Sequence, residues 1–138
     1  MKTAVRAGAR YVDVEIESSK EFIEDIKKTA LENKCDLIIS YHNYEETPDL
    51  KELVAIVAEC FLLGADVAKA ACMVIENKDN ATILSLFRQG RRIIALGMGE
   101  KGKITRIAGP ILGAEFTFAA PDQGEGTAPG RRGRSRWA

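Results

Sequence analysis

The sequence predicts an α/β fold in which a parallel β-sheet is covered by helices. Short apolar runs alternate with helical patterns along the chain, and the order helix, Gly-Ala, strand occurs at Gly8-Ala9 and again at Gly64-Ala65. Between residues 37 and 71 a strand, a helix and a second strand follow one another through short connections. This is a βαβ unit, so its two strands are expected to be parallel. The same alternation continues toward residue 119, which extends the sheet.

Five strands and five helical segments are expected from this alternation. The strands are short apolar or alternating runs bounded by turn-forming residues, at 11–16, 37–41, 66–71, 93–98 and 115–119. The helices show apolar residues at helical spacing or end at a glycine, at 3–7, 18–33, 47–64, 79–88 and 105–112.

Two of the helices have recognisable ends. Ser18 with Glu21 predicts a capping box at the start of one of them. Thr47 is suited to the N-cap of the next helix, Pro48 to its first position, and Gly64 to the residue just after its end.

Composition is that of an ordinary globular domain. The chain has 138 residues, of which 46% are hydrophobic and 29% charged, and its formal net charge is zero. This length suits one domain, and the balanced charge gives no argument for a polyanionic partner. Cys35, Cys60 and Cys72 lack the spacing of metal ligands and are expected to be reduced, buried thiols of a cytoplasmic protein. No apolar run is long enough to cross a bilayer, and no signal-peptide pattern opens the chain.

The composition changes at residue 121. Residues 1–120 are expected to form the (β/α) domain, and 121–138 a loop followed by a basic tail that starts at Arg131. The tail has no periodicity, so a disordered segment, or one altered by a frameshift, is favoured over an arm that binds nucleic acid.

Lys69 and His42 are the first candidates for chemistry. Lys69 lies inside an apolar strand, where desolvation disfavours the charged form of an amine, and a neutral amine is what imine chemistry needs. A lysine that extends past the strand end, or one that pairs with a carboxylate, is an equally good interpretation. His42, the only histidine, follows the preceding strand of the βαβ unit. Both residues therefore lie at the sheet edge where α/β proteins build active sites, and His42 is suited to move protons.

Carboxylates and an arginine complete the set of candidates. Strand periodicity places Asp13, Glu15 and Glu17 on one face, where pairing with His42 or Lys69 would offset their desolvation; a solvated face is the alternative. Arg106 follows a glycine-rich loop after the fourth strand, a position suited to binding a carboxylate or phosphate.

With these residues in place, the chain resembles the type I 3-dehydroquinate dehydratases. The specific part is Ser-x-His-x-x-x-x-Thr-Pro followed by a lysine in the next strand. The matching segments occur in the order and at the spacing of that family, and they are Tyr-Val-Asp-Val-Glu (11–15), Ile-Ile-Ser-Tyr-His-Asn-Tyr-Glu-Glu-Thr-Pro (38–48), Gly-Ala-Asp-Val-Ala-Lys-Ala-Ala (64–71), Met-Gly-Glu-Lys-Gly-Lys-Ile-Thr-Arg (98–106) and Thr-Ala-Pro-Gly (127–130).

The resemblance implies a role for each matched catalytic residue. Lys69 resembles the lysine that forms an imine with the substrate ketone. His42 resembles the histidine that removes the α-proton and then protonates the departing hydroxyl, and Glu15 the carboxylate that orients it. An iminium beside the α-carbon withdraws electrons, which makes that proton acidic enough for an imidazole.

The resemblance also implies substrate-binding residues. Arg106 resembles the arginine that binds the substrate carboxylate, and Met98 a methionine that lines the pocket. Thr127 matches a hydroxyl residue of the loop that closes over the substrate. Arg131 stands where the family has a glutamine in that loop, so it is placed with the substrate-binding residues.

The implied fold is a TIM-type (β/α)₈ barrel, here a partial barrel with about five of its eight strands. The implied function is Schiff-base dehydration of 3-dehydroquinate to 3-dehydroshikimate in the shikimate pathway, a lyase reaction that uses no cofactor and no metal. The alternatives are an inactive barrel fragment or assembly module that keeps the site by descent, and another Schiff-base lyase or aldolase, which the histidine segment argues against. The expected partner is the small-molecule substrate, with no nucleic acid and no membrane, and with possible dimers or self-association through open sheet edges.

Overall fold

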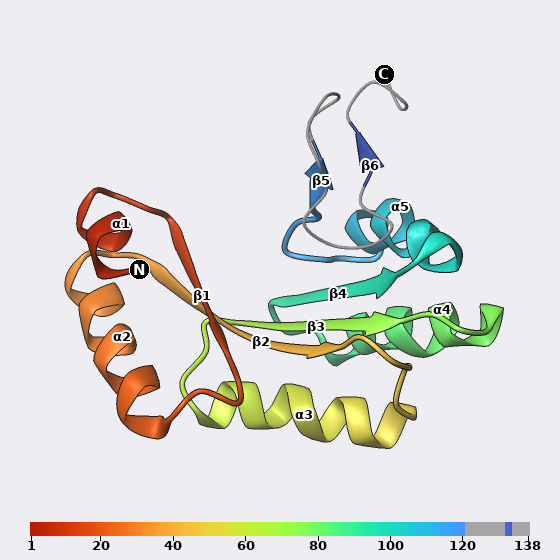
Figure 1. Ribbon diagram of the computed structural model, residues 1–138, viewed down its shortest axis with the longest axis horizontal. Helices are drawn as coiled ribbons and strands as arrows, with labels where there is room; N and C mark the ends of the chain where they lie inside the picture. The colour runs from red at the N-terminus through yellow and green to blue at the C-terminus, as the bar shows by residue number, and fades with distance from the viewer. Residues whose placement is uncertain (121–131, 134–138) are drawn as a thin grey trace.

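The computed structural model describes residues 1–120 and 132–133, and it contains a four-stranded parallel sheet (Figure 1). The strands are β1 (Tyr11–Glu15), β2 (Asp36–Asn43), β3 (Val67–Met73) and β4 (Ile93–Met98), in the spatial order β1-β2-β3-β4. Each strand is parallel to the next, as the βαβ pattern predicts. No helix of the described residues is long and apolar enough to span a membrane.

The helical elements fill the connections between the strands. They are α1 (Lys2–Arg6), α2 (Lys20–Glu32), α3 (Leu50–Leu62), α4 (Asn77–Leu84) with the 3₁₀ turn η1 (Ser85–Gln89), and η2 (Glu100–Gly102) with α5 (Lys103–Ile111). Helices α2, α3 and α4 cover one face of the sheet, and α5 packs along β4 at the edge of the sheet (Figure 1).

The two faces of the sheet differ in character. The outer face carries small and branched side chains that pack against the helices in one apolar cluster. We call the opposite face the inner face. Its side chains alternate with those of the outer face, and register brings together Asp13 and Glu15 of β1; Ile38, Ser40 and His42 of β2; Val67, Lys69, Ala71 and Met73 of β3; and Ile94, Leu96 and Met98 of β4.

Two expected helix starts are wrong by one or two residues. The N-cap of α2 is Ser19, whose hydroxyl accepts a hydrogen bond from the Phe22 amide at 3.2 Å, and not Ser18. The N-cap of α3 is Asp49, because its carboxylate accepts from the Glu52 amide at 2.8 Å. The hydroxyl of Thr47 is used elsewhere, since it donates to the Met73 carbonyl at 2.7 Å.

The expected fifth strand of the main sheet, at 115–119, is also wrong. One backbone hydrogen bond, from the Glu115 amide to the Ile93 carbonyl at 3.0 Å, joins this segment to β4, and no ladder follows. Phe116 and Phe118 pack against the inner face instead. The next strand, β5 (Ala119–Ala120), pairs with β6 (Arg132–Gly133) in a separate two-stranded sheet.

Candidate active site

Lys69 is placed on the inner face by the alternation of β3. In register it lies between Ser40 of β2 and Ile94 of β4. Its Nζ atom donates to an Asp13 carboxylate oxygen at 2.7 Å, and 11% of its side chain is exposed. Lys69 thus has the carboxylate partner that one interpretation of the sequence required, and it remains close to the apolar part of the same face.

Aromatic side chains from the segment after α5 shield Lys69 from water. The Phe118 ring lies 5.0 Å from its Nζ atom, and Phe118 in turn packs on Phe116, at 5.4 Å between ring centroids. The neighbouring apolar side chains of the inner face, among them Val67, Ile94 and Met98, are almost fully buried. The aromatic segment that fails to form a fifth strand therefore covers part of the face where the missing strands of the barrel would pack.

His42 is held by a second carboxylate of β1. Its Nδ1 atom is 2.9 Å from an oxygen of Glu15, and the Tyr44 ring stacks nearly parallel to the imidazole at 5.9 Å between centroids. A carboxylate at Nδ1 favours the tautomer with the proton there, which leaves Nε2 as a proton acceptor. The imidazole side chain is 17% exposed, so this free side can reach a bound molecule.

The Asp13–Lys69 and Glu15–His42 pairs lie side by side because strand register aligns them. Glu15 is opposite Ser40, which is opposite Lys69, and His42 is opposite Ala71, one step further along the same face. One strand spacing and two residues along the strand separate His42 from Lys69, which is about 8 Å between Cα atoms. A small molecule bound covalently to Lys69 would lie within reach of the imidazole. The pairing expected for the carboxylates of β1 is confirmed for Asp13 and Glu15.

Arg106 is brought to the carboxyl end of β4 by a close contact of two glycines. A Cβ atom on Gly102 would lie 2.4 Å from the Gly97 carbonyl carbon, so only glycine permits this approach. The Thr105 hydroxyl secures the contact, since it accepts from the Gly97 amide at 2.8 Å and donates to the Gly102 carbonyl at 2.7 Å. The next residue, Arg106, is 6% exposed.

The other expected substrate-binding residues are placed only in part. Met98 is the last residue of β4, lies on the inner face opposite Met73, and is 1% exposed. Thr127 and Arg131 lie outside the described residues. Asp13 was expected on this face with His42 or Lys69 as a partner, but sequence reasoning gave it no role in the reaction. Its position two residues before Glu15 in an alternating strand was the available signal.

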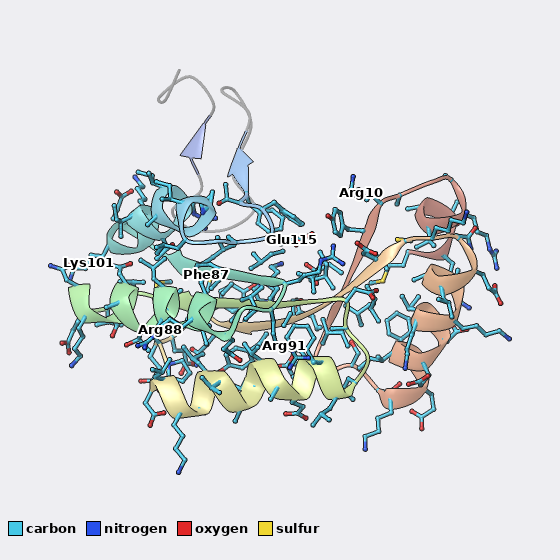
Figure 2. The ribbon with its side chains drawn as sticks, turned by 180° about the vertical axis from the view of Figure 1, so that it is seen from behind. Arg10, Phe87, Arg88, Arg91, Lys101 and Glu115 are labelled. Carbon is cyan, nitrogen blue, oxygen red and sulfur yellow. The ribbon has the colours of Figure 1, made fainter. Side chains whose placement is uncertain are left out.

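A network of charged side chains lies at the amino ends of the strands. The Arg92 guanidinium donates to Asp36 at 2.7 Å and to Glu115 at 2.6 Å, and the Tyr11 hydroxyl also donates to Glu115, at 3.0 Å. Hydrogen bonding from Arg92 lowers the pKa of Glu115, and the charge of Arg10, on the same side of the molecule in Figure 2, adds to this. The network links the starts of β1, β2 and β4, so its role is structural.

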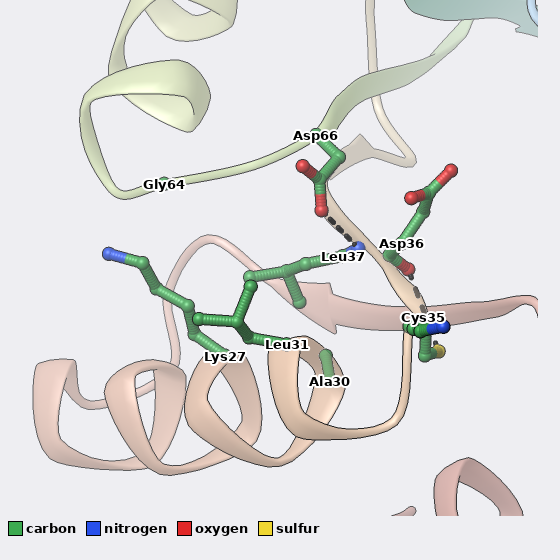
Figure 3. Close-up of a pocket in the computed structure, with 9 residues that line it drawn as sticks. Lys27, Ala30, Leu31, Cys35, Asp36, Leu37, Gly64 and Asp66 are labelled. Atoms are coloured by element: carbon green, nitrogen blue, oxygen red, sulfur yellow. Dashed lines mark hydrogen bonds between the residues drawn. The ribbon is translucent and has the colours of Figure 1, made fainter.

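A pocket of about 340 Å³ also lies at this amino end, between α2 and the starts of β2 and β3 (Figure 3). The Asp66 carboxylate there accepts from the Leu37 amide at 2.8 Å, and the Lys27 side chain covers Gly64, where an added Cβ would lie 2.7 Å from its Nζ atom. These contacts support the fold. The chemistry of parallel α/β sheets is found at the carboxyl ends of the strands. His42 lies near the carboxyl end of β2, as expected, whereas Lys69 is the third residue of β3.

The three cysteines are free and buried, as expected. Burial raises the pKa of the Cys60 thiol, and that of the Cys72 thiol, to about 12. Burial also raises the pKa of Cys35. Within the described part of the chain, no group of three histidine, cysteine or carboxylate side chains could hold a metal ion.

Comparison with known proteins identifies relatives over nearly the whole chain. The family model for type I 3-dehydroquinase matches residues 1–132. The 3-dehydroquinate dehydratase of Methanocaldococcus jannaschii is 39% identical over 134 residues, which are 95% of this chain and 59% of that protein. The 3-dehydroquinate dehydratase of Methanococcus vannielii is 37% identical over 132 residues, covering 95% and 60% of the two chains. The chain therefore spans about 60% of the length of these curated relatives.

Solved structures give the same result at the level of the fold. The crystal structure of 3-dehydroquinate dehydratase from Geobacillus kaustophilus superposes with a TM-score of 0.86 at 29% identity, covering 98% of this chain and 54% of that one. The type I enzyme from Clostridium difficile, solved with covalently modified comenic acid, gives a TM-score of 0.85 at 30% identity, covering 98% and 55%. The four-stranded sheet is thus part of a TIM-type barrel.

Proposed function

Because the chain belongs to the type I 3-dehydroquinase family, we propose that it supplies the imine-forming half of a 3-dehydroquinate dehydratase, which converts 3-dehydroquinate to 3-dehydroshikimate in the shikimate pathway. The observation that carries the proposal is the arrangement of two carboxylate-paired side chains on the inner face. Lys69, a nucleophile, and His42, a proton carrier, are each held by a carboxylate of β1, on adjacent strands of the sheet.

The proposed reaction begins at Lys69. Its amine attacks the substrate ketone, and loss of one water leaves an iminium between Nζ and the former carbonyl carbon. The Nε2 atom of His42 then takes the proton from the adjacent carbon, and the electrons of that C–H bond move toward the iminium to give an enamine. When the enamine electrons return, the hydroxyl at the next carbon leaves with a proton from His42. Hydrolysis of the remaining iminium releases the product and Lys69, so the net change is loss of one water.

The surrounding residues have binding roles in this proposal. Arg106, buried at the carboxyl end of β4, pairs with the substrate carboxylate, and Met98 provides an apolar wall. Thr127 and Arg131 are assigned to substrate binding on the resemblance alone. Glu15 orients His42 through Nδ1 and stabilises the imidazolium that forms during proton transfer.

Two further parts of the proposal concern the setting of the chain. We place it in the cytoplasm, which agrees with three unpaired, buried thiols. We also propose that it associates through its open sheet edges, because β1 and β4 each have a strand neighbour on one side only among the described residues.

Borohydride trapping tests the proposed function. Reduction in the presence of 3-dehydroquinate should add the mass of the reduced ligand to the peptide that contains Lys69, and Lys69→Ala should abolish this. Trapping that persists in Lys69→Ala would contradict the assignment of the nucleophile. Formation of the conjugated product, followed by ultraviolet absorbance, separates an enzyme from an inactive fragment that keeps the site by descent. Trapping with other ketones but not with 3-dehydroquinate would favour a different Schiff-base lyase.

A further inference from the structure

The Asp13–Lys69 pair has an unusual geometry. The two residues lie on β1 and β3, so their side chains meet across β2, and Nζ is nevertheless 2.7 Å from the Asp13 oxygen. Strands are about 4.8 Å apart, and register places Asp13 level with Val67, two residues before Lys69, so the pair bridges about 12 Å between Cα atoms. The residue of β2 in register with Lys69 is Ser40, which is fully buried. A side chain this small leaves room for the lysine to reach across the strand.

The charges on the inner face are divided into two separate pairs. Glu15 is committed to His42 at 2.9 Å, and Asp13, two residues earlier, to Lys69 at 2.7 Å. The Lys69 side chain is 11% exposed and that of Asp13 is 34% exposed, so the lysine is the more desolvated partner. A poorly hydrated ammonium depends on its counter-ion, and the same carboxylate touches the atom that would react.

We propose that Asp13 is a further catalytic residue, which serves as the proton acceptor and donor of the imine-forming step; this rests on the proposed function. Before a carbonyl compound arrives, Asp13 holds Lys69 as an ammonium on the inner face. The Asp13 carboxylate takes one proton from the ammonium, the neutral amine attacks the carbonyl carbon, and the Asp13 carboxyl returns this proton to the oxygen as the C–N bond forms. The carboxylate then takes a second proton from the nitrogen and gives it to the carbinolamine hydroxyl, which leaves as water. The iminium replaces the ammonium, and the Asp13 carboxylate is again the counter-ion of a cation.

This step needs no other reactant and leaves His42 for the carbon chemistry. An ammonium and a ketone become an iminium and water with no net gain or loss of protons. Asp13 therefore transfers protons at Nζ of Lys69, and Glu15 orients the imidazole of His42.

Two labelling reactions at Lys69 of the chain 1–138 test the proposal, because they differ in their need for a proton donor. Acetic anhydride acylates the neutral amine and needs no proton returned to an oxygen. Imine formation, trapped with borohydride, requires the returned proton. Asp13→Asn should therefore speed acetylation of Lys69 about tenfold, with exposed Lys78 as the internal reference. It should slow trapping by 3-dehydroquinate and by acetaldehyde about 10²-fold.

The controls separate this role from a structural one. Asp13→Glu keeps the carboxylate and should restore both rates toward those of the wild type, and Glu17→Gln, which removes one exposed charge nearby, should change neither. Ser40→Val fills the path between the two groups and should resemble Asp13→Asn. Equal acetylation rates in folded Asp13→Asn and wild type, or equal trapping rates, would overturn the proposal. Loss of the far-ultraviolet circular dichroism spectrum in both Asp13→Asn and Ser40→Val would also overturn it, because the Asp13–Lys69 pair would then be needed for folding.

The two carbonyl compounds keep this proposal distinct from the proposed function. If acetaldehyde shows the opposed effects and 3-dehydroquinate is not trapped by the wild type, the proposed substrate is wrong and the role of Asp13 stands. If both are trapped equally well with and without Asp13, the proposed function stands and the role of Asp13 is wrong.

Discussion

At the scale of single residues, the direction of each side chain on β1 decides what the site can do. Alternation sends Asp13 and Glu15 to the inner face and Val12 and Val14 to the helices. The acid nearer the carboxyl end meets the histidine, and the other meets the lysine. The result is a nucleophile and a proton carrier that each have their own counter-ion.

His42→Ala tests whether imine formation at Lys69 and proton transfer by His42 are separate steps. In a full-length barrel the substitution should lower kcat about 10²–10⁴-fold, the usual contribution of one general acid–base group. Trapping of the product as an imine should survive, because Lys69 and Asp13 remain paired. Steady-state turnover and borohydride trapping, measured on the same preparation, report the two effects separately. Near-normal turnover in His42→Ala would mean that the histidine is structural.

The buried thiols give a second prediction at this scale. Burial raises the pKa of Cys60 and of Cys72 to about 12, so their thiolate fraction at neutral pH is about 10³-fold below that of an ordinary cysteine. Native protein at pH 7.5 should therefore react very slowly with iodoacetamide at both positions. In guanidinium chloride all three cysteines should alkylate readily. Rapid labelling of Cys60 or Cys72 in the native protein, read by mass spectrometry, would show that their burial is not maintained.

The candidate residues were largely predictable from sequence because they lie in strongly patterned strands. His42 and Lys69 lie on adjacent strands of one βαβ unit, and the register of a parallel sheet aligns them. The resemblance implied that Glu15 orients His42, but the pairing of Asp13 with Lys69 rather than with His42 was not predictable, because alternation gives the face of a residue and not how far a long side chain reaches. The crossing of Lys69 over Ser40 to Asp13 depends on packing in three dimensions.

At the scale of elements, tertiary contacts override local signals at several boundaries. Thr47 followed by Pro48 is a good helix start by local chemistry, but the Thr47 hydroxyl bonds to the end of β3 and Asp49 caps α3 two residues later. Residues 115–119 alternate as a strand would, yet Phe116 and Phe118 pack against the inner face and the segment forms no ladder with β4. Sequence periodicity identified the four strands of the main sheet and could not identify these competing partners.

The contact between β4 and α5 can be tested with two glycines of the same region. Gly102→Ala would place a Cβ atom 2.4 Å from backbone, so it should destabilise the protein by about 2 kcal/mol and displace Arg106. Gly109→Ala is the matched control, because its Cβ would lie 3.6 Å from its nearest neighbours, and alanine in a helix interior gains up to about 1 kcal/mol over glycine. Denaturant titration of both variants measures the difference. A Gly102→Ala variant as stable as Gly109→Ala would contradict the close approach.

At the scale of the whole molecule, Arg92 links segments that are distant in sequence, and this gives the stability a pH dependence. The pKa of Glu115 is lowered in the folded protein, so the folded state binds this proton less readily than the unfolded chain. The resulting stabilisation is fully present above the unfolded value, about pH 4.3, and is lost as the pH falls through the lower folded value.

Glu115→Gln should therefore flatten the acid side of the stability curve. Because the Arg92 side chain is partly exposed, we expect the variant to lose only about 1 kcal/mol of unfolding free energy at pH 7. This loss should become smaller below pH 4, where Glu115 of the wild type becomes protonated. Thermal melts of wild type and variant between pH 3 and 7 measure this. Glu100→Gln, which removes a charge from an exposed i,i+3 pair, is the control and should change the acid limb little. A constant difference between wild type and Glu115→Gln at every pH would assign the effect to packing.

The chain of residues 1–138 by itself should be a weak enzyme that self-associates. The main sheet has β1 and β4 as its end strands, and a parallel sheet with open edges pairs readily with other chains, whereas a closed barrel has no edges. About 40% of the length of the curated relatives has no counterpart in this chain. Groups that position the substrate ring are expected in that unmatched part. Loss of positioning alone can lower the rate about 10²-fold.

The matched comparison is a chimaera in which this chain replaces its counterpart in the Methanocaldococcus jannaschii 3-dehydroquinate dehydratase, a segment that makes up 59% of that protein. The molar mass of residues 1–138, measured by light scattering, should rise with concentration. Residues 1–138 should form the conjugated product at least about 10²-fold more slowly than the chimaera does. The chimaera should be uniform in size at the same concentrations, because closure removes both edges. Lys69→Ala in the chimaera should abolish turnover without changing its size, which separates the chemistry from the assembly. A monodisperse monomer of residues 1–138 with turnover equal to that of the chimaera would mean that Phe116 and Phe118 close the inner face well enough to replace the remaining strands.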